Sequence, residues 1–319
     1  MTFFQTEYSI PSSKALLELV KQNYNIEGLC SCKFWKSGSN TTYMIETITE
    51  KYILRVYHYG KWVLDEILYE VNLLLFLKKA GMSVSAPVYM NNGELVTKIS
   101  APEGERFVVM FEYANGKRMR TNEVISTKLG EAAAHLHLIT KAFNTNYTRP
   151  KINIYNLIDI PTKALLQELK HNEIFTEKII LASEKVKSKL AKIESELEQG
   201  VCHGDLFSGN CHIDENEEIT LFDFDECSPG YIAYDLAVYY WSMKREGQPK
   251  IMWEEFLKAY KQVKGLSEKD EEAIALLVIG RQLWFMAQVI VFRANILGHS
   301  ISSDLFISQQ IDFLDSLTE

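Results

Sequence analysis

The chain has 319 residues and a formal net charge of −8 at pH 7. This length favours one large domain or two lobes with a sizeable core, and the acidic balance argues against nucleic acid as a partner. With 47% hydrophobic and 24% charged residues the composition is that of a globular protein. The five cysteines are an odd number without a compact framework, so we expect reduced thiols in a cytoplasmic protein.

No segment of the sequence is expected to insert into a membrane. No basic region followed by an apolar one opens the sequence, so no signal peptide is expected. The most apolar stretch, residues 274–297, is interrupted by Arg281 and Arg293, which predicts buried helices. Cys30 and Cys32 have no matching second pair, so we expect small buried side chains there instead of a zinc site.

The first third of the chain is mainly β-rich. A helix is predicted from Ser12 to Asn23. A stronger one is predicted over 63–80, where apolar residues recur at helical spacing and Gly81 follows. Turn residues separate short apolar stretches that predict antiparallel strands over residues 31–35, 41–47, 52–59, 86–90, 94–99 and 106–111.

The rest of the chain is predicted to be largely helical. Ser267 to Asp270 is expected to cap one helix. Other helices are predicted over residues 127–138, 162–170, 176–197, 253–263 and 302–317. His135 and His137 are two positions apart, so on a helix they face different ways and make a poor metal pair. We expect each to be a packed or surface histidine.

Residues 201–240 carry the strongest chemical signal. Two short strands and a polar turn at 214–218 are predicted, with polar groups where the strands end. Asp205 closes a His-Gly-Asp triplet, Asn210 follows five residues later, and Asp223 follows the second apolar run. We expect these three side chains to converge. Such oxygen ligands suit Mg²⁺, which keeps room for substrate phosphates.

This spacing, with Asp-Leu-Ala at 235–237, resembles the aminoglycoside phosphotransferase superfamily. That group includes choline kinases, homoserine kinases of the second type and a stress-response kinase branch, and the segments beyond residue 250 are similar to the last two. The resemblance implies an α+β, bilobal, protein-kinase-like fold. An N-terminal lobe at 1–115, an antiparallel sheet with one key helix, would bind the nucleotide, and ATP and Mg²⁺ are the implied cofactors. A larger, mainly helical lobe at 116–319 would hold the catalytic and acceptor groups.

The resemblance also implies where the nucleotide binds. The Ser37–Thr42 loop stands where this fold places its phosphate-covering hairpin. Arg55 stands where the fold usually has a lysine, and it would pair with Glu70 or, as the alternative, Glu66; a solvated strand arginine is the other interpretation. The adenine would bond to the backbone near Gly116, at the hinge. The implied nucleotide-binding residues are Ser39, Asn40, Thr41, Arg55, Glu70, Glu112 and Ala114.

For phosphoryl transfer, Asp205 would take the proton of the acceptor hydroxyl, while Asn210 and Asp223 would hold Mg²⁺. His203 is expected to support the loop by hydrogen bonding. Asp235 is expected either to accept amide bonds from that loop or to be a plain helix N-cap. A metallohydrolase built on His203, Asp205, His212 and Asp223 and a catalytically inactive nucleotide-binding module are the competing hypotheses.

The expected acceptor is a small hydroxyl compound of the aminoglycoside, amino alcohol or hydroxy amino acid class. Aromatic side chains beside carboxylates suit an ammonium group, whereas Arg281 would suit a carboxylate. Core packing is the alternative for the helix aromatics. The candidate acceptor-binding residues are Asp225, Glu226, Arg281 and Trp284. A serine/threonine protein kinase of the stress-response type is the runner-up, and no oligomeric state is predicted.

Overall fold

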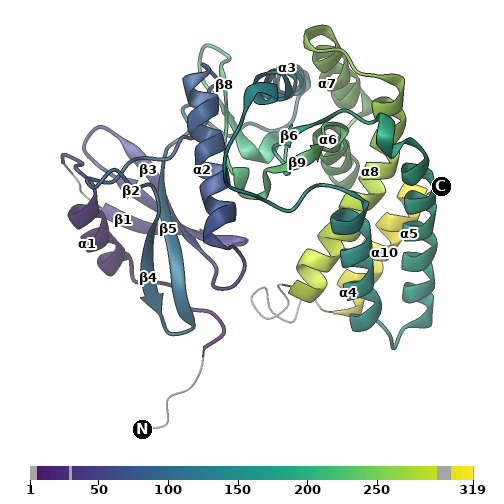
Figure 1. Cartoon of the computed structure of the whole chain (residues 1–319), viewed down its shortest axis with the longest axis horizontal. Helices are drawn as coiled ribbons and strands as arrows, with labels where there is room; N and C mark the ends of the chain where they lie inside the picture. Colours follow the sequence, from purple (N-terminus) through teal and green to yellow (C-terminus); the bar gives the residue numbers. More distant parts are fainter. Residues whose placement is uncertain (1–5, 29–30, 293–302, 319) are drawn as a thin grey trace. The chain divides into compact units, whose positions relative to one another are not determined.

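The computed structural model describes residues 6–28, 31–292 and 303–318. The chain divides into two compact units. The first contains residues 1–115, 144–148 and 220–222, and the second contains residues 116–143, 149–219 and 223–319. Each unit is described by itself below, with the element labels of Figure 1.

The first unit is built on a five-stranded antiparallel sheet (Figure 1). Its strand order is β1-β2-β3-β5-β4. The strands are β1 Ser31–Ser37, β2 Asn40–Glu46, β3 Lys51–Tyr57, β4 Thr97–Ala101 and β5 Gly104–Glu112. Two helices accompany the sheet, α1 Ser13–Asn23 and α2 Leu64–Lys79. The predicted helices 12–23 and 63–80 are therefore confirmed.

Strand β3 shows how the sheet separates its two helices. Leu54 and Val56 belong to one buried cluster with Leu16 of α1. Because successive side chains of a strand point to opposite faces, Arg55 projects to the other face. There it reaches Glu70 of α2. A one-residue alternation in the sequence therefore sends the charged side chain towards α2 and the apolar ones towards α1.

One predicted strand is wrong. Residues 86–90 meet β5 through an isolated bridge at Pro87, made by the amide of Glu112 on the carbonyl of Ala86 and the amide of Val88 on the carbonyl of Met110, each at 2.8 Å. Pro87 is the non-hydrogen-bonded residue of this pair, so its missing amide hydrogen leaves the bridge intact, but the pairing does not continue into a ladder. The segment runs extended beside the sheet without becoming a strand of it.

The second unit is mainly helical (Figure 1). Its α-helices are α3 Glu123–Ile139, α4 Ile160–Glu168, α5 Glu173–Ile193, α6 Ala233–Arg245, α7 Lys250–Val263, α8 Glu268–Ala287 and α10 Asp304–Thr318. Helix α8 is central and packs against α4, α5, α6 and α10, while α3 packs against α7. The Ser267 hydroxyl accepts the amide of Asp270 at 3.0 Å, so the predicted cap of α8 is confirmed. The sheet and these helices together confirm the α+β class.

One stretch, Glu268–Val291, is long and apolar enough by composition alone to cross a membrane. Its most apolar window is 72% buried within the protein, as in a core helix. This agrees with the predicted buried helices up to residue 292, and the remainder of that prediction lies outside the described residues. Cys32, Cys202, Cys211 and Cys227 are free thiols, and Cys30 lies outside the described residues.

Short strands and turns connect the helices. The predicted strands around the core stretch are present as β6 Gln199–Cys202 and β8 Ile219–Leu221, with β7 Cys211–Ile213 and β9 Ser228–Tyr231 in addition. The polar turn between β7 and β8 is closed by the amide of Asp214 on the carbonyl of Glu218 at 3.1 Å. Short 3₁₀ segments cover 140–142, 194–196, 208–210 and 224–226, and π segments cover 155–159 and 288–292.

Candidate active site

The loop after β6 is held from below by Asp235. This carboxylate is fully buried in the first turn of α6. Its Oδ2 accepts the amide of His203 at 2.7 Å, and its Oδ1 accepts the amide of Gly204 at 2.9 Å. Asp235 is therefore not the N-cap, which is Ile232. Its two oxygens therefore fix the backbone of residues 203 and 204, from which the chain continues into Asp205.

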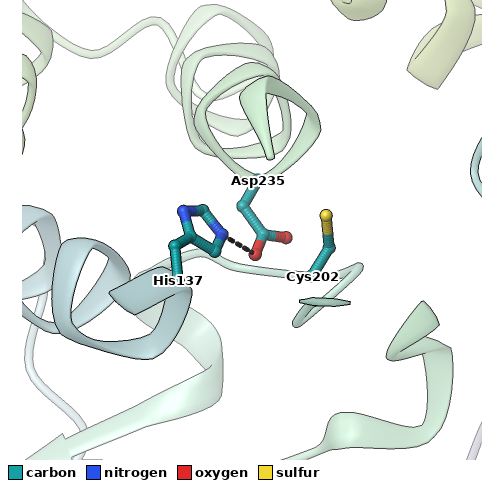
Figure 2. A group of neighbouring side chains, drawn as sticks. All are labelled: His137, Cys202 and Asp235. Atoms are coloured by element: carbon teal, nitrogen blue, oxygen red, sulfur yellow. Dashed lines mark hydrogen bonds and ion pairs between the residues drawn. The ribbon is translucent and has the colours of Figure 1, made fainter. Parts of the chain in front are cut away.

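Figure 2 shows that His137 and Cys202 flank the same carboxylate. His137 Nε2 lies 3.0 Å from Asp235 Oδ2, and its Nδ1 lies 2.9 Å from the hydroxyl of Tyr260. The Cys202 thiol donates to the carbonyl of Tyr231, and burial followed by the Asp235 charge raises its pKa well above the ordinary value. The thiol is neutral and both nitrogens of the histidine are already hydrogen-bonded. This cluster is therefore a hydrogen-bonded network that is poorly suited to bind a metal ion. His135 is exposed while His137 is buried, so the two do face different ways.

Asp205 is the residue that this loop presents. Its Oδ2 accepts the side-chain amide of Asn210 at 2.8 Å, and the same Asn210 nitrogen donates to the backbone carbonyl of Asp205 at 2.9 Å. Its Oδ1 accepts from Arg281 Nη2. The Asp205 side chain is 26% exposed, whereas that of Arg281 is 5% exposed. The carboxylate is thus oriented through both oxygens while part of it faces solvent.

Arg281 reaches this loop from α8 and is held by aromatic residues. Its Nη1 donates to the carbonyl of Gly204 at 3.2 Å and to the hydroxyl of Tyr234 at 3.3 Å. The guanidinium carbon lies 5.1 Å from the ring centre of Trp241 and 4.5 Å from that of Trp284. Burial raises the pKa of Tyr234 to about 12, so this hydroxyl is neutral at physiological pH.

The segment after Asp223 packs directly on the same loop. Gly204 has φ +82°, and a Cβ added there would stand 2.0 Å from the carbonyl oxygen of Glu226. The rings of His203 and Phe224 lie 4.2 Å apart. The segment is fixed from its other side by Arg149, a buried residue that donates to the carbonyls of Phe224, Asp225 and Cys227, the last at 2.7 Å. Asp223 itself is in the left-handed region at φ 65°, which an aspartate tolerates better than most residues.

These residues offer the donor set that Mg²⁺ prefers. The Asn210 side-chain nitrogen donates to Asp205, so its side-chain oxygen is the atom that could serve as a metal ligand. Asp223 supplies a half-buried carboxylate on the adjoining segment. Amide and carboxylate oxygens on two segments in backbone contact fit a hard divalent cation. Their role as metal ligands stays a prediction.

The first unit contains the second charged pair. Arg55 Nη1 lies 2.6 Å from Glu70 Oε1, and the side chains of these two residues are 6% and 0% exposed. The hydroxyl of Tyr57 donates to the other Glu70 oxygen at 2.9 Å, and the Phe111 ring lies 4.7 Å from the guanidinium carbon. The alternative of a solvated strand arginine is therefore wrong, because the side chain is buried. Glu66 instead accepts the amide of Val63 at the start of α2.

The turn between β1 and β2 is less uniform than the sequence suggests. Ser39 is half-buried, but Asn40 and Thr41 are 5% and 0% exposed. The Thr41 hydroxyl lies 3.1 Å from Arg106 Nη2 inside the unit. This contact supports the turn from inside the unit, and the nucleotide-binding role of Thr41 stays a prediction. The alternation along β2 turns residue 41 inward, which the sequence could not show without the register.

At the expected hinge, the carbonyl of Glu112 already accepts the Ser85 hydroxyl, and Ala114 is buried. A carbonyl has a second lone pair, so an adenine contact there stays a prediction. Asp225 is 4% exposed, whereas Glu226 and Trp284 are half-buried. Their acceptor-binding roles also stay predictions.

The supporting roles of several residues could not be predicted from the sequence. Arg149 lies in a connecting segment without a motif, and Tyr234 and Trp241 resemble ordinary helix residues until Arg281 is placed between them. His137 was expected only to be packed or exposed. The one signal available in the sequence was an arginine or histidine within an apolar segment, because such a side chain requires hydrogen-bonding partners when it is buried.

A family model described as the phosphotransferase enzyme family matches residues 32–277. The chain belongs to this family. It is 31% identical over 288 residues to an uncharacterised protein of Synechocystis, covering 89% of this chain and 80% of that one. It is 25% identical over 279 residues to a homoserine kinase of Brucella canis, covering 83% and 80%.

Two solved structures are similar over nearly the whole chain. A microcompartment-associated aminopropanol kinase has a TM-score of 0.78 at 21% identity, covering 95% of both chains. An amicoumacin kinase in complex with AMP-PNP and Ca²⁺ has a TM-score of 0.74 at 20% identity, covering 96% of this chain and 94% of that one. The kinase-like fold of the family member described here is thereby confirmed. Family membership makes the chain a phosphotransferase that acts on hydroxyl groups.

Proposed function

We propose that this phosphotransferase moves the γ-phosphate of ATP to a hydroxyl of a small molecule of the amino alcohol, hydroxy amino acid or aminoglycoside class. The observation that carries the proposal is the Asp205 carboxylate, oriented by Asn210 and Arg281 on a loop whose amides are held by Asp235. Phosphoryl transfer requires mainly positioning and charge neutralisation, and a carboxylate held through both oxygens meets the first requirement. The Brucella canis relative and the two solved structures are named as kinases of homoserine, amicoumacin and aminopropanol.

In this mechanism Asp205 accepts the proton of the acceptor hydroxyl as the hydroxyl oxygen bonds to the γ-phosphorus. The bond from that phosphorus to the β,γ-bridging oxygen breaks, and ADP leaves with the electron pair. Mg²⁺, when bound, would neutralise charge on the phosphates, with Asn210 and Asp223 as its protein ligands. In the first unit Arg55, held by Glu70, would hold the phosphates in place.

We assign Arg281 to orienting the Asp205 base, and not to binding the acceptor. Its guanidinium already donates to Asp205, the carbonyl of Gly204 and the Tyr234 hydroxyl, so a substrate carboxylate would have to displace one of them. Glu226 and Trp284 are the better exposed of the four candidate acceptor residues. A carboxylate and an indole favour an ammonium-bearing acceptor. The free thiols of the described cysteines suit the cytoplasmic location that we propose.

A metallohydrolase is not favoured, because His203 Nδ1 already accepts the amide of Asp205 and its ring packs on Phe224. The test is incubation with γ-labelled ATP and Mg²⁺ against amino alcohols, hydroxy amino acids and aminoglycosides, with generic protein substrates in parallel. Label on a small acceptor is expected. Label only on protein serine or threonine would favour a protein kinase and reject the small-molecule acceptor.

The Asp205→Asn variant checks the proposed base. Transfer should fall by about 10²–10⁴-fold while ADP·Mg²⁺ binding persists, because the base is required only in the transition state. Asp159→Asn is the matched control, since Asp159 pairs with Lys187 on the surface of the same unit. An equal loss of nucleotide affinity and transfer in Asp205→Asn would contradict the assignment.

A further inference from the structure

The chain before α1 is fastened to the sheet of the first unit. This segment, residues 8–11, is held at Ser9, whose carbonyl accepts from Arg106 Nη1 at 2.7 Å. The Ser9 amide and hydroxyl both donate to Glu103, at 3.3 and 3.1 Å. The carbonyl of Pro11, at the end of the segment, accepts the hydroxyl of Tyr43 at 2.5 Å. Arg106 and Tyr43 are among the most completely buried large side chains, so these attachments belong to the core.

The fastened segment places the hydroxyl of Tyr8 at the open end of the β1–β2 turn. That hydroxyl lies 2.7 Å from Thr41 Oγ1 and is also hydrogen-bonded to Ser37 Oγ. Ser37 and Thr41 are direct cross-strand partners, the last pair before the turn. Side chains of such a pair share one face of the sheet. A single phenol therefore links both ends of the turn that carries Gly38 and Ser39.

The Tyr8 ring is itself confined. It packs edge-on against His58 at 4.8 Å between ring centres, and the Arg106 guanidinium lies 5.6 Å from its centre. The same Arg106 donates through Nη2 to Thr41 at 3.1 Å. Tyr8 and Arg106 thus meet at one buried hydroxyl, on the inner side of the turn. Within the turn, the Gly38 amide donates to the Asn40 carbonyl at 3.0 Å.

We propose that Tyr8 is a positioning residue that holds the β1–β2 turn in the shape that receives the nucleotide phosphates. This rests on the proposed function, in which that turn covers the phosphates. The turn has one glycine and small polar residues in place of a glycine-rich loop, and the hydroxyls at its two ends, on Ser37 and Thr41, are both bonded to the Tyr8 hydroxyl. Ordering a turn during folding removes that entropy cost from ligand binding. Tyr8 supplies the ordering from outside the hairpin.

Tyr8→Phe removes one oxygen and keeps the ring against His58 and Arg106. Losing one ordinary hydrogen-bonded link is expected to weaken ADP·Mg²⁺ binding by about 3- to 10-fold. Adenosine, which has no phosphate, should bind with unchanged affinity. A merely structural role would lower the unfolding temperature and weaken both ligands together, so the difference between the two ligands reports on the turn.

The experiment is calorimetric titration of the full chain with ADP·Mg²⁺ and with adenosine. Tyr52→Phe is the matched control, because it removes the hydroxyl that bonds to Glu50 at the opposite end of the same sheet, and its affinities should equal those of the wild type. Unchanged ADP affinity in Tyr8→Phe, or equal weakening of ADP and adenosine, would overturn the inference alone. A wild-type protein that binds ADP no better than adenosine would overturn the proposed function with it.

Discussion

Replacing Asp235 with asparagine tests whether one buried carboxylate sets the geometry of the catalytic loop. Both of its oxygens accept backbone amides, from His203 at 2.7 Å and from Gly204 at 2.9 Å. An asparagine has one acceptor oxygen, and its NH₂ group cannot accept. Whichever way the amide is turned, one loop N–H loses its partner, although the NH₂ could still face His137. A buried donor left in this way costs about 1–3 kcal/mol, and Asp235→Ala, which strands both, costs about 2–6 kcal/mol.

Asp270→Asn is the matched control in the same unit. Asp270 is 1% exposed, and its Oδ1 accepts the amide of Glu198 at 3.0 Å. Its other oxygen, however, accepts the hydroxyl of Ser267, which can reverse and accept from an NH₂ group. Asparagine can therefore satisfy this site, and we expect a cost below about 1 kcal/mol. Both substitutions replace an aspartate with an asparagine. They differ in whether the hydrogen-bond partners can change from donor to acceptor.

Thermal unfolding and labelled-phosphate transfer measure the two consequences. Asp235→Asn should lower the unfolding midpoint by roughly 2–10 °C. At a temperature where both variants are folded, it should also slow transfer, because Asp205 loses its fixed direction. Asp270→Asn should transfer at the wild-type rate. A wild-type midpoint for Asp235→Asn, or equal effects of the two substitutions on transfer, would refute the reasoning.

Three further predictions concern the charged pairs and the close approach at the loop. Arg55→Lys keeps the charge but loses the fork, so the KM for ATP should rise about 3- to 10-fold, with Arg55→Ala more severe; wild-type kinetics for both would make it a strand residue only. Gly204→Ala meets a backbone carbonyl and should abolish most transfer, whereas Gly247→Ala, at φ +62° in open space, should cost only about 1–2 kcal/mol in a denaturation series. Arg281→Met should lower kcat about 10- to 100-fold, the worth of one charge-assisted hydrogen bond to Asp205, and leave the Kd for ADP unchanged; a matching loss of ADP affinity would contradict its assignment to the base.

Much of the fold followed from local patterns. Apolar spacing predicted α2, and turn residues predicted β1 to β3, because these features depend on period and punctuation within one segment. The strand predicted at 86–90 failed because an isolated apolar stretch does not reveal over how many residues a neighbouring strand bonds to it, and here the pairing is one isolated bridge. The burial of Thr41 could not be predicted for a related reason, since which side chains of a strand are buried depends on the register.

By itself the sequence determined the family, because Asp205, Asn210 and Asp223 lie within one short stretch whose spacing can be seen along the chain; their chemical roles stay predictions. Only the tertiary structure decided what holds them. Arg281 is 76 residues from Asp205 in the chain, and Arg149 is 76 residues from Asp225. The packing of α8 brings Arg281 to Asp205. Neither this contact nor that of Arg149 follows a periodic pattern that could be seen in the sequence. A buried charge must be satisfied wherever the fold places it, so its partners are known only when the fold is known.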